Sequence, residues 1–326
     1  MKSKKDLRIV FMGTPEFAVE SLRRLVDEGY NIVGVVTMPD KPMGRHQDVL
    51  QMCAVKQYAC AAGLHVLQPV RLKDETFLSQ LRTLKADLQI VAAFRMLPEI
   101  VWAMPPLGTF NLHASLLPQY RGAAPINWAI INGETETGVT TFFLKQEIDT
   151  GAVILQTKAP IYDTDNAGSL HNRLMRLGAK LVIETVELIL NGNATATPQE
   201  QLPVNAATLH TAPKIFKETC RIDWSHNTVK QLYDFVRGLA PYPAAHTVLK
   251  TVDGKSLTLK VFATTKEFCT HNTAPSTVLS DTRTYMKVAA TDGYLHLEDI
   301  QVAGKKRMPI AAFLRGFRSV DGAIMI

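Results

Sequence analysis

The stretch LRIVFMGTPEF, residues 7–17, indicates the class of fold. Residues 7–12 are an apolar run of strand length, Gly13-Thr14-Pro15 turns the chain, and the apolar residues that follow recur at roughly helical spacing. Further segments of the two kinds then alternate, with strand-like runs at 31–37, 64–67, 86–94 and 108–113 and helix-like ones at 54–62 and 74–85. Strands that alternate with helices predict a parallel sheet covered on both faces, with ligands at the carboxyl ends of the strands.

The last third of the chain has a different pattern. Residues 169–190 have the pattern of one long helix, and the stretch 191–203 is rich in Asn, Thr, Ala, Gly and Pro, as a linker is. Beyond it, short strand-like runs are separated by turns, after a helix near 228–239. We therefore expect a Rossmann-like parallel-sheet domain at 1–190, a linker at 191–207 and a small OB-like β-barrel at 208–326.

Composition excludes several classes of protein. The chain has 326 residues and is 46% hydrophobic, enough for two cores, and no apolar run is long enough for a membrane helix. The cysteines are far apart, with no CxxC pair, and the nine histidines have no metal-ligand spacing. We expect a cytoplasmic protein with reduced thiols, no metal and no membrane partner.

The net charge of +6 is unevenly distributed. Residues 208–326 hold 16 lysines and arginines against 10 acidic residues, whereas residues 1–207 hold 20 of each. A neutral first domain with a basic second one fits chemistry in the first and a polyanionic partner for the second. The charge alone fits a merely soluble basic surface equally well.

The residues suited to catalysis follow the expected strand 108–113. Asn111 and His113 are two apart on that strand and so face the same side. An Asn amide stabilises an oxyanion without changing charge, and an imidazole donates or accepts a proton near neutrality. Asp149, before Thr150-Gly151, could orient that imidazole. Taken singly, these residues also fit a structural hydrogen-bonded pair and an ordinary Asx turn.

The turn at Gly13-Thr14-Pro15 argues against a nicotinamide enzyme. A dinucleotide fold would place GxGxxG there, whereas this chain has one glycine and then a proline, which has no amide donor.

Taken together, these segments resemble the methionyl-tRNA formyltransferase family over nearly the whole chain. The motifs that carry the resemblance are RIVFMGTPEF at 8–17, NLHASLLP at 111–118, RGAAPI at 121–126, ETGVT at 136–140, DTG at 149–151, RIDW at 221–224 and AGKK at 303–306. The Asn-x-His and Asp-x-Gly set is common to transferases and hydrolases that use 10-formyltetrahydrofolate. Among these enzymes, Gly13-Thr14-Pro15 near the start and the RIDW segment are typical of the branch whose formyl acceptor is an aminoacyl-tRNA or an amino sugar.

The resemblance implies a reaction and a role for each residue. The formyl group of 10-formyltetrahydrofolate passes to the amine of methionyl initiator tRNA, Asn111 and His113 stabilise the oxyanion, and Asp149 orients His113 and relays the amine proton. The folate lies against Ser115, Leu116, Leu117, Pro118, Phe94 and Leu97. The tRNA contacts Arg45, Lys214, Lys305 and Lys306. We expect a monomer.

Two alternatives stay open at this point. An amino-sugar-nucleotide N-formyltransferase would share the catalytic trio, and a non-catalytic tRNA- or folate-binding protein would share the fold. The segment 39–51 is expected to be a polar loop, which in the family meets the tRNA acceptor end. Two departures from the family pattern bear on the contacts: Gln47 and Asp48 replace two lysines of that loop, and Ala93-Phe94-Arg95 replaces Ala-Tyr-Gly in a loop one residue shorter.

Overall fold

The computed structural model describes residues 3–43, 49–203 and 208–326. The chain forms two compact units, and each is discontinuous in sequence. The first unit comprises Met1–Gly122, Thr137–Pro160 and His171–Thr211; the second comprises Ala123–Glu136, Ile161–Leu170 and Ala212–Ile326. The expected domain boundaries at 190 and 208 stay a prediction.

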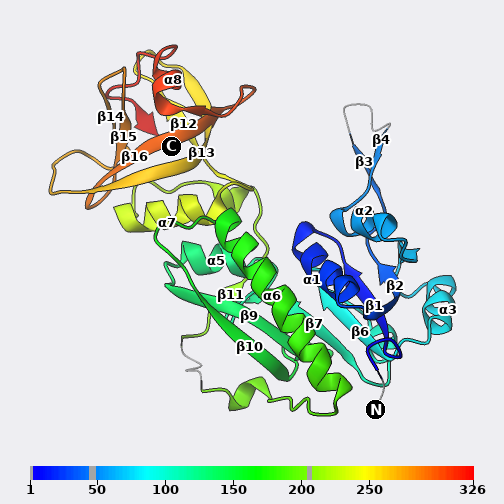
Figure 1. Ribbon diagram of the computed structural model, residues 1–326. Helices are drawn as coiled ribbons and strands as arrows, with labels where there is room; N and C mark the ends of the chain where they lie inside the picture. Colours follow the sequence, from blue (N-terminus) through cyan, green and yellow to red (C-terminus); the bar gives the residue numbers. More distant parts are fainter. Residues whose placement is uncertain (1–2, 44–48, 204–207) are drawn as a thin grey trace. The chain divides into compact units, whose positions relative to one another are not determined.

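The first unit is built on one sheet with the strand order β10-β9-β7-β6-β1-β2-β5 (Figure 1). Its strands are β1 (Arg8–Gly13), β2 (Asn31–Val36), β5 (Val66–Leu67), β6 (Leu88–Ala92), β7 (Thr109–His113), β9 (Glu136–Phe143) and β10 (Val153–Pro160). The pairs from β5 to β7 are parallel, and β9 is antiparallel to β7. The predicted Rossmann-like sheet is therefore confirmed.

Helices pack against both faces of this sheet. They are α1 (Glu16–Asp27), α2 (Ala54–Ala61), α3 (Glu75–Thr83), α4 (Glu99–Trp102) and the long α6 (Ala167–Leu190). On one face, Phe77, Leu78 and Leu81 of α3 join Val10 and Met12 of β1 in a buried cluster. On the other, α6 approaches β7 so closely that a Cβ on Gly178 would lie 2.7 Å from the Leu112 side chain.

The segment expected as a polar loop at 39–51 contains a short hairpin instead. β3 (Lys41–Met43) pairs antiparallel with β4 (Val49–Gln51), and runs of three residues are too short to reveal a strand period in sequence. At its base the Asp40 carboxylate accepts hydrogen bonds from Lys56 Nζ (2.5 Å) and Gln68 Nε2 (2.9 Å). The hydrogen bond from Lys56 lowers the pKa of Asp40 below its ordinary value.

The second unit is a nearly closed antiparallel barrel with the strand order β14-β15-β16-β13-β12-β18 (yellow to red in Figure 1). Its strands are β12 (Ala245–Lys250), β13 (Ser256–Phe268), β14 (Val278–Ser280), β15 (Met286–Ala289), β16 (Gly293–Val302), β17 (Met308–Pro309) and β18 (Ile324–Met325). Ile324 also bridges Thr277, next to β14, so the two edges of the sheet meet. The expected barrel is therefore confirmed.

The barrel interior is apolar and its one buried indole is satisfied. Trp224 is 2% exposed, and its Nε1 donates to Thr247 Oγ1 at 2.9 Å. The remaining elements of the chain are β8 (Arg121–Gly122), β11 (Thr211–Ala212), α5 (Pro125–Ile131), α7 (Val229–Leu239), α8 (Ile310–Leu314) and 3₁₀ turns at Gln199–Gln201 and Glu218–Cys220. Helix α7 begins at a capping box made by Thr228 and Gln231.

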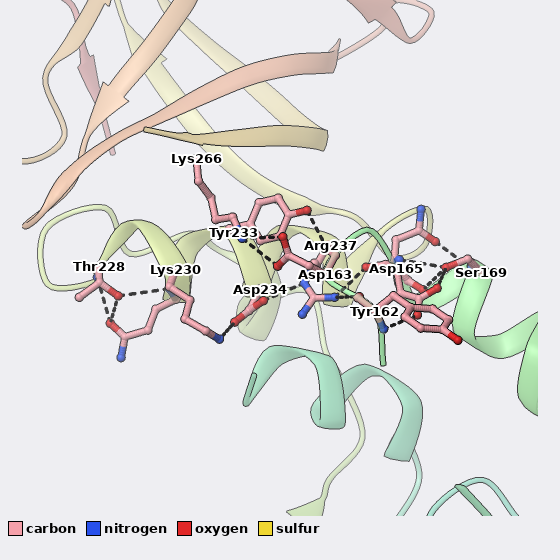
Figure 2. A network of polar contacts seen from close by, with 12 residues as sticks. Tyr162, Asp163, Asp165, Ser169, Thr228, Lys230, Tyr233, Asp234, Arg237 and Lys266 are labelled. Atoms are coloured by element: carbon pink, nitrogen blue, oxygen red, sulfur yellow. Dashed lines mark hydrogen bonds and ion pairs between the residues drawn. The ribbon is translucent and has the colours of Figure 1, made fainter. Parts of the chain in front are cut away.

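A polar network within the second unit joins the segment Ile161–Leu170 to α7 and β13 (Figure 2). The Arg237 guanidinium donates to the backbone carbonyls of Tyr162 (3.0 Å) and Asp165 (2.9 Å), and its Nε donates to the buried Asp234 carboxylate at 2.7 Å. Lys266 contacts both oxygens of Asp163 at 2.8 Å. The segment that leads into α6 is therefore fixed to the barrel unit, although it lies far from it in sequence.

None of the helices in residues 3–43, 49–203 and 208–326 combines the length and the apolar character that crossing a bilayer requires.

Candidate active site

Strand β7 places Asn111 and His113 at the carboxyl edge of the parallel sheet. β7 lies between β6 and β9, and its side chains alternate, so the two residues share one face. His113 is 6% exposed, whereas Asn111 is partly accessible. Within the described ranges, no residue hydrogen-bonds the Asn111 amide, which leaves its N–H donors free for a ligand.

The loop after β7 is held rigidly by side chains of the neighbouring strands. Thr140 on β9 donates to the Ser115 carbonyl at 2.7 Å and accepts from the Leu117 amide at 3.2 Å. Gln156 on β10 donates to the Leu117 carbonyl at 2.8 Å. These hydrogen bonds fix the backbone of residues 115–117, which follow His113. A ligand that binds against this loop therefore meets a surface that is already formed.

The two ring nitrogens of His113 have different surroundings. Nε2 lies 2.9 Å from the Tyr120 carbonyl oxygen, which can only accept, so Nε2 carries a hydrogen in either charge state. Nδ1 faces Asp149 Oδ2 at 3.8 Å, too far for a direct hydrogen bond. Nδ1 is therefore the ring nitrogen that remains available to a reacting group.

Asp149 is held in a strained backbone conformation. Its φ of +53° lies in the left-handed region, which costs a non-glycine residue about 1 kcal/mol. Its Oδ2 accepts from the Gly122 amide at 3.0 Å. Gly151 is required two residues later, because a Cβ there would lie 1.7 Å from the Phe143 carbonyl oxygen. Strain of this kind is typical of functional sites.

Backbone groups and one glutamine of this site were not predicted. The Tyr120 carbonyl and the Gly122 amide belong to the backbone and have no sequence signal. Gln199 lies in the stretch expected as a linker, yet it is 2% exposed and its Nε2 donates to the carbonyls of Asp149 (2.8 Å) and Gly151 (2.9 Å). A glutamine in an irregular stretch rich in Asn, Thr, Ala, Gly and Pro gives no pattern from which this contact could be predicted.

The residues expected to contact folate lie in two adjacent loops of the first unit. Ser115 is fully buried, and its hydroxyl donates to the Gln119 carbonyl at 2.6 Å. Leu117 and Pro118 are buried, while Leu116 keeps some accessible surface. Phe94 and Leu97 follow β6, the parallel neighbour of β7, and pack on the cluster that includes α3.

The loop with the altered family motif is anchored by Arg95. Its guanidinium donates to the backbone carbonyls of Pro69 (2.5 Å) and Val70 (2.8 Å) and lies over the Phe94 ring. Burial lowers the pKa of the Arg95 guanidinium. Arg95 therefore fixes the place of this loop beside Pro69.

The residues expected to contact tRNA include three lysines whose positions the structure describes. Arg45 lies outside the described residues. Lys305 and Lys306 lie side by side in the exposed turn between β16 and β17, and Lys305 extends over the Phe317 ring at 5.1 Å. Lys214 is exposed, with its ammonium 5.4 Å from the Phe216 ring centre. All three lysines belong to the second unit.

Across the described part of the chain, no three His, Cys, Asp or Glu side chains are grouped as a metal site would need. The expected absence of a metal stays a prediction.

Family comparisons agree with the geometry of both units. The formyl transferase family profile matches residues 7–186, and the profile of the formyl transferase C-terminal domain matches residues 214–318. The first match contains Asn111, His113 and Asp149 together, and the second contains the barrel strands from β12 to β17.

Full-length relatives are close. The methionyl-tRNA formyltransferase of Parabacteroides distasonis is 63% identical over 97% of this chain and 98% of its own length. That of Flavobacterium johnsoniae is 50% identical over 98% of this chain and 99% of its own length.

Solved structures share the fold at low identity. A variant of HypX from Aquifex aeolicus matches with a TM-score of 0.63 at 20% identity, over 97% of this chain and 48% of HypX, so this chain spans about half of HypX. The sugar 3N-formyl transferase WlaRD matches with a TM-score of 0.60 at 17% identity, over 94% of this chain and 100% of its own. The family expected from the sequence motifs is confirmed by the profiles and the full-length relatives: the chain belongs to the formyltransferase family and, within it, to the methionyl-tRNA formyltransferases.

Proposed function

We propose that the protein transfers the formyl group of 10-formyltetrahydrofolate to the α-amino group of methionyl initiator tRNA, for translation initiation. The observation that supports this most directly is the geometry at the carboxyl edge of the first unit's sheet. An unengaged Asn111 amide lies on the same strand face as His113, whose free nitrogen faces Asp149 at 3.8 Å. The full-length relatives with 50% and 63% identity carry the name methionyl-tRNA formyltransferase.

The chemistry follows from the positions of these atoms. The bond that forms joins the methionyl nitrogen to the formyl carbon, and the bond that breaks joins that carbon to N10 of the folate. Asn111 donates to the formyl oxygen as it becomes an oxyanion, and a cationic His113 stabilises the same charge through Nδ1. The amine loses one proton and N10 gains one. Asp149, held beside Nδ1 by the Gly122 amide, stabilises the cationic ring and relays the amine proton.

The folate and the tRNA have separate proposed contacts. The rigid loop at Ser115, Leu116, Leu117 and Pro118, with Phe94 and Leu97, forms the folate wall. Lys305, Lys306 and Lys214 contact tRNA phosphates, since ammonium groups on an exposed surface suit backbone contacts without sequence preference. Arg45, which lies outside the described residues, is proposed as a further phosphate contact. The protein works as a cytoplasmic monomer without a resident metal.

The proposal is tested by the choice of acceptor. Purified protein with labelled 10-formyltetrahydrofolate should label methionyl initiator tRNA, whereas a dTDP-linked amino sugar should stay unlabelled. The control is uncharged initiator tRNA, which lacks the amine. Labelling of the amino sugar alone would support the sugar alternative, and folate binding without transfer to either acceptor would support a non-catalytic binding protein.

A further inference from the structure

Gln199 uses its whole hydrogen-bonding capacity on the loop that carries Asp149 and on Arg121. Its two N–H donors reach the carbonyls of Asp149 (2.8 Å) and Gly151 (2.9 Å), on either side of Thr150. Its Oε1 accepts from Arg121 Nε (3.0 Å) and Nη2 (2.6 Å). Carbonyl oxygens accept and a guanidinium donates, so only one orientation of the Gln199 amide satisfies all four contacts.

Arg121 is the middle residue of the run 120–122, and its two neighbours hold the proposed catalytic side chains. The Tyr120 carbonyl accepts from His113 Nε2 at 2.9 Å, and the Gly122 amide donates to Asp149 Oδ2 at 3.0 Å. Through Arg121, Gln199 therefore connects the backbone of Asp149 to residues 120–122, which fix the Asp149 carboxylate and the His113 ring. The distance between Nδ1 and Oδ2 depends on this closed set of contacts.

The glutamine also explains how the strained loop persists. Asp149 has a φ of +53°, and a left-handed residue that is not glycine needs neighbours that hold it there. Gln199 is 2% exposed, so solvent water competes little for its bonds. A neutral amide supplies the two donors without placing a charge beside Asp149 and His113.

We propose that Gln199, oriented by Arg121, is a positioning residue for formyl transfer, which holds the Asp149 carboxylate in its place beside Nδ1 of His113. This inference rests on the proposed catalytic role of Asp149. It predicts that Gln199 affects the chemical step through Asp149 and leaves the binding of both substrates nearly unchanged.

The test is a double-mutant cycle on single-turnover formyl transfer to methionyl initiator tRNA. Gln199→Ala should slow transfer by about 10- to 100-fold, as a small displacement of a catalytic group does. The KM values for folate and tRNA should stay within about twofold of wild type, since Gln199 is 2% exposed and offers almost no surface for a substrate to contact. In an Asp149→Asn background, Gln199→Ala should change the rate by less than about twofold, because the two residues act as one unit.

Two further variants separate positioning from folding. Gln199→Glu keeps the side chain's shape and its contacts with Arg121 but loses both donors when ionised, so it should slow transfer while the protein stays folded. Arg8→Ala is the matched control. Arg8 donates from Nε and Nη2 to the Leu84 carbonyl (3.0 and 2.8 Å) at the amino end of β1, whereas the candidate site lies at the carboxyl edge of the sheet. It should lower the thermal midpoint without changing the transfer rate.

The possible outcomes are distinguishable. Equal slowing by Gln199→Ala in both backgrounds, or no slowing in wild type, would overturn the positioning role while Asp149 keeps its own. Full transfer by Asp149→Asn alone would overturn the catalytic assignment of Asp149, and with it the role of Gln199.

Discussion

At the scale of single residues, the site depends on backbone groups as much as on side chains. His113 is oriented by the Tyr120 carbonyl at 2.9 Å, and Asp149 by the Gly122 amide at 3.0 Å. Asn111, His113 and Asp149 could be named from the sequence because the family motif includes their side chains. The partners that orient them could not, since a carbonyl or an amide is present at nearly every position of a chain.

Gly151 gives a prediction at this scale. A Cβ at this position would lie 1.7 Å from the Phe143 carbonyl oxygen, so Gly151→Ala must displace the loop that carries Asp149. We expect the free energy of unfolding to fall by about 1–3 kcal/mol, as overpacking does. Formyl transfer should also slow, and urea unfolding with single-turnover assays measures both effects.

The matched control is Gly316→Ala, where the nearest atom to the new Cβ is the Phe313 carbonyl oxygen at 3.8 Å. It should change neither quantity appreciably. A Gly151→Ala protein with wild-type stability and rate would mean that the loop accommodates a side chain and that its conformation is not essential.

At the scale of elements, the periodic segments were predicted well and the short hairpin of β3 and β4 was not. The alternation of apolar strands and helices gave the parallel sheet because each segment is long enough to show its period. β3 and β4 have three residues each, and the segment 39–51 was therefore expected to be a loop. Gln199 lies in a 3₁₀ turn of three residues, so its contacts depend on tertiary structure alone.

The segment between β10 and α6 gives a prediction on pH. The hydrogen bond from Lys266 lowers the pKa of Asp163 below its ordinary value of 3.8. A carboxyl whose pKa is lower in the folded state stabilises the fold above its unfolded pKa, and this stability is lost as pH falls through the folded pKa. Asp163→Asn should therefore lower the thermal midpoint at pH 7, and the difference from wild type should shrink as pH falls below about 4.

Scanning calorimetry between pH 7 and pH 2.5 provides the comparison. In a Lys266→Met background, Asp163→Asn should have little effect at any pH, because the partner that lowers the pKa is gone. A difference between Asp163→Asn and wild type that stays constant down to the lowest pH would show that the ion pair does not contribute.

At the scale of the whole molecule, charge and chemistry are divided between parts of the chain. Residues 208–326 carry the entire net positive charge, and the proposed catalytic residues Asn111, His113 and Asp149 lie in the first unit. Charge counting indicated a polyanionic partner but fitted a merely soluble surface equally well, because a count does not locate a surface. The compact units also combine segments that are distant in sequence. Ile161–Leu170 belongs to the same unit as the barrel, whereas the sequence pattern placed it in the first domain, at 1–190.

Salt dependence tests the partner of the basic unit. If Lys305 and Lys306 contact two phosphates, affinity for methionyl initiator tRNA should fall about tenfold between 50 and 200 mM salt from these contacts alone. Lys306→Ala should make the dependence on salt shallower by about one phosphate contact. Filter binding across salt concentrations measures the slope.

The control for this experiment is Lys255→Ala, in the same barrel. Lys255 pairs with Asp253 at 2.8 Å in the turn between β12 and β13, so its loss should leave the slope unchanged. A slope that is flat in wild type would contradict the assignment of this unit to tRNA.

The catalytic role of Asp149 is tested most sharply by single-turnover transfer of labelled formyl to methionyl initiator tRNA by wild type and Asp149→Asn at saturating substrates. We expect transfer by wild type, a loss of about 100-fold or more in Asp149→Asn, and folate affinity within about twofold of wild type. Transfer by Asp149→Asn at the wild-type rate would contradict it, because the carboxylate 3.8 Å from His113 would then have no part in the reaction.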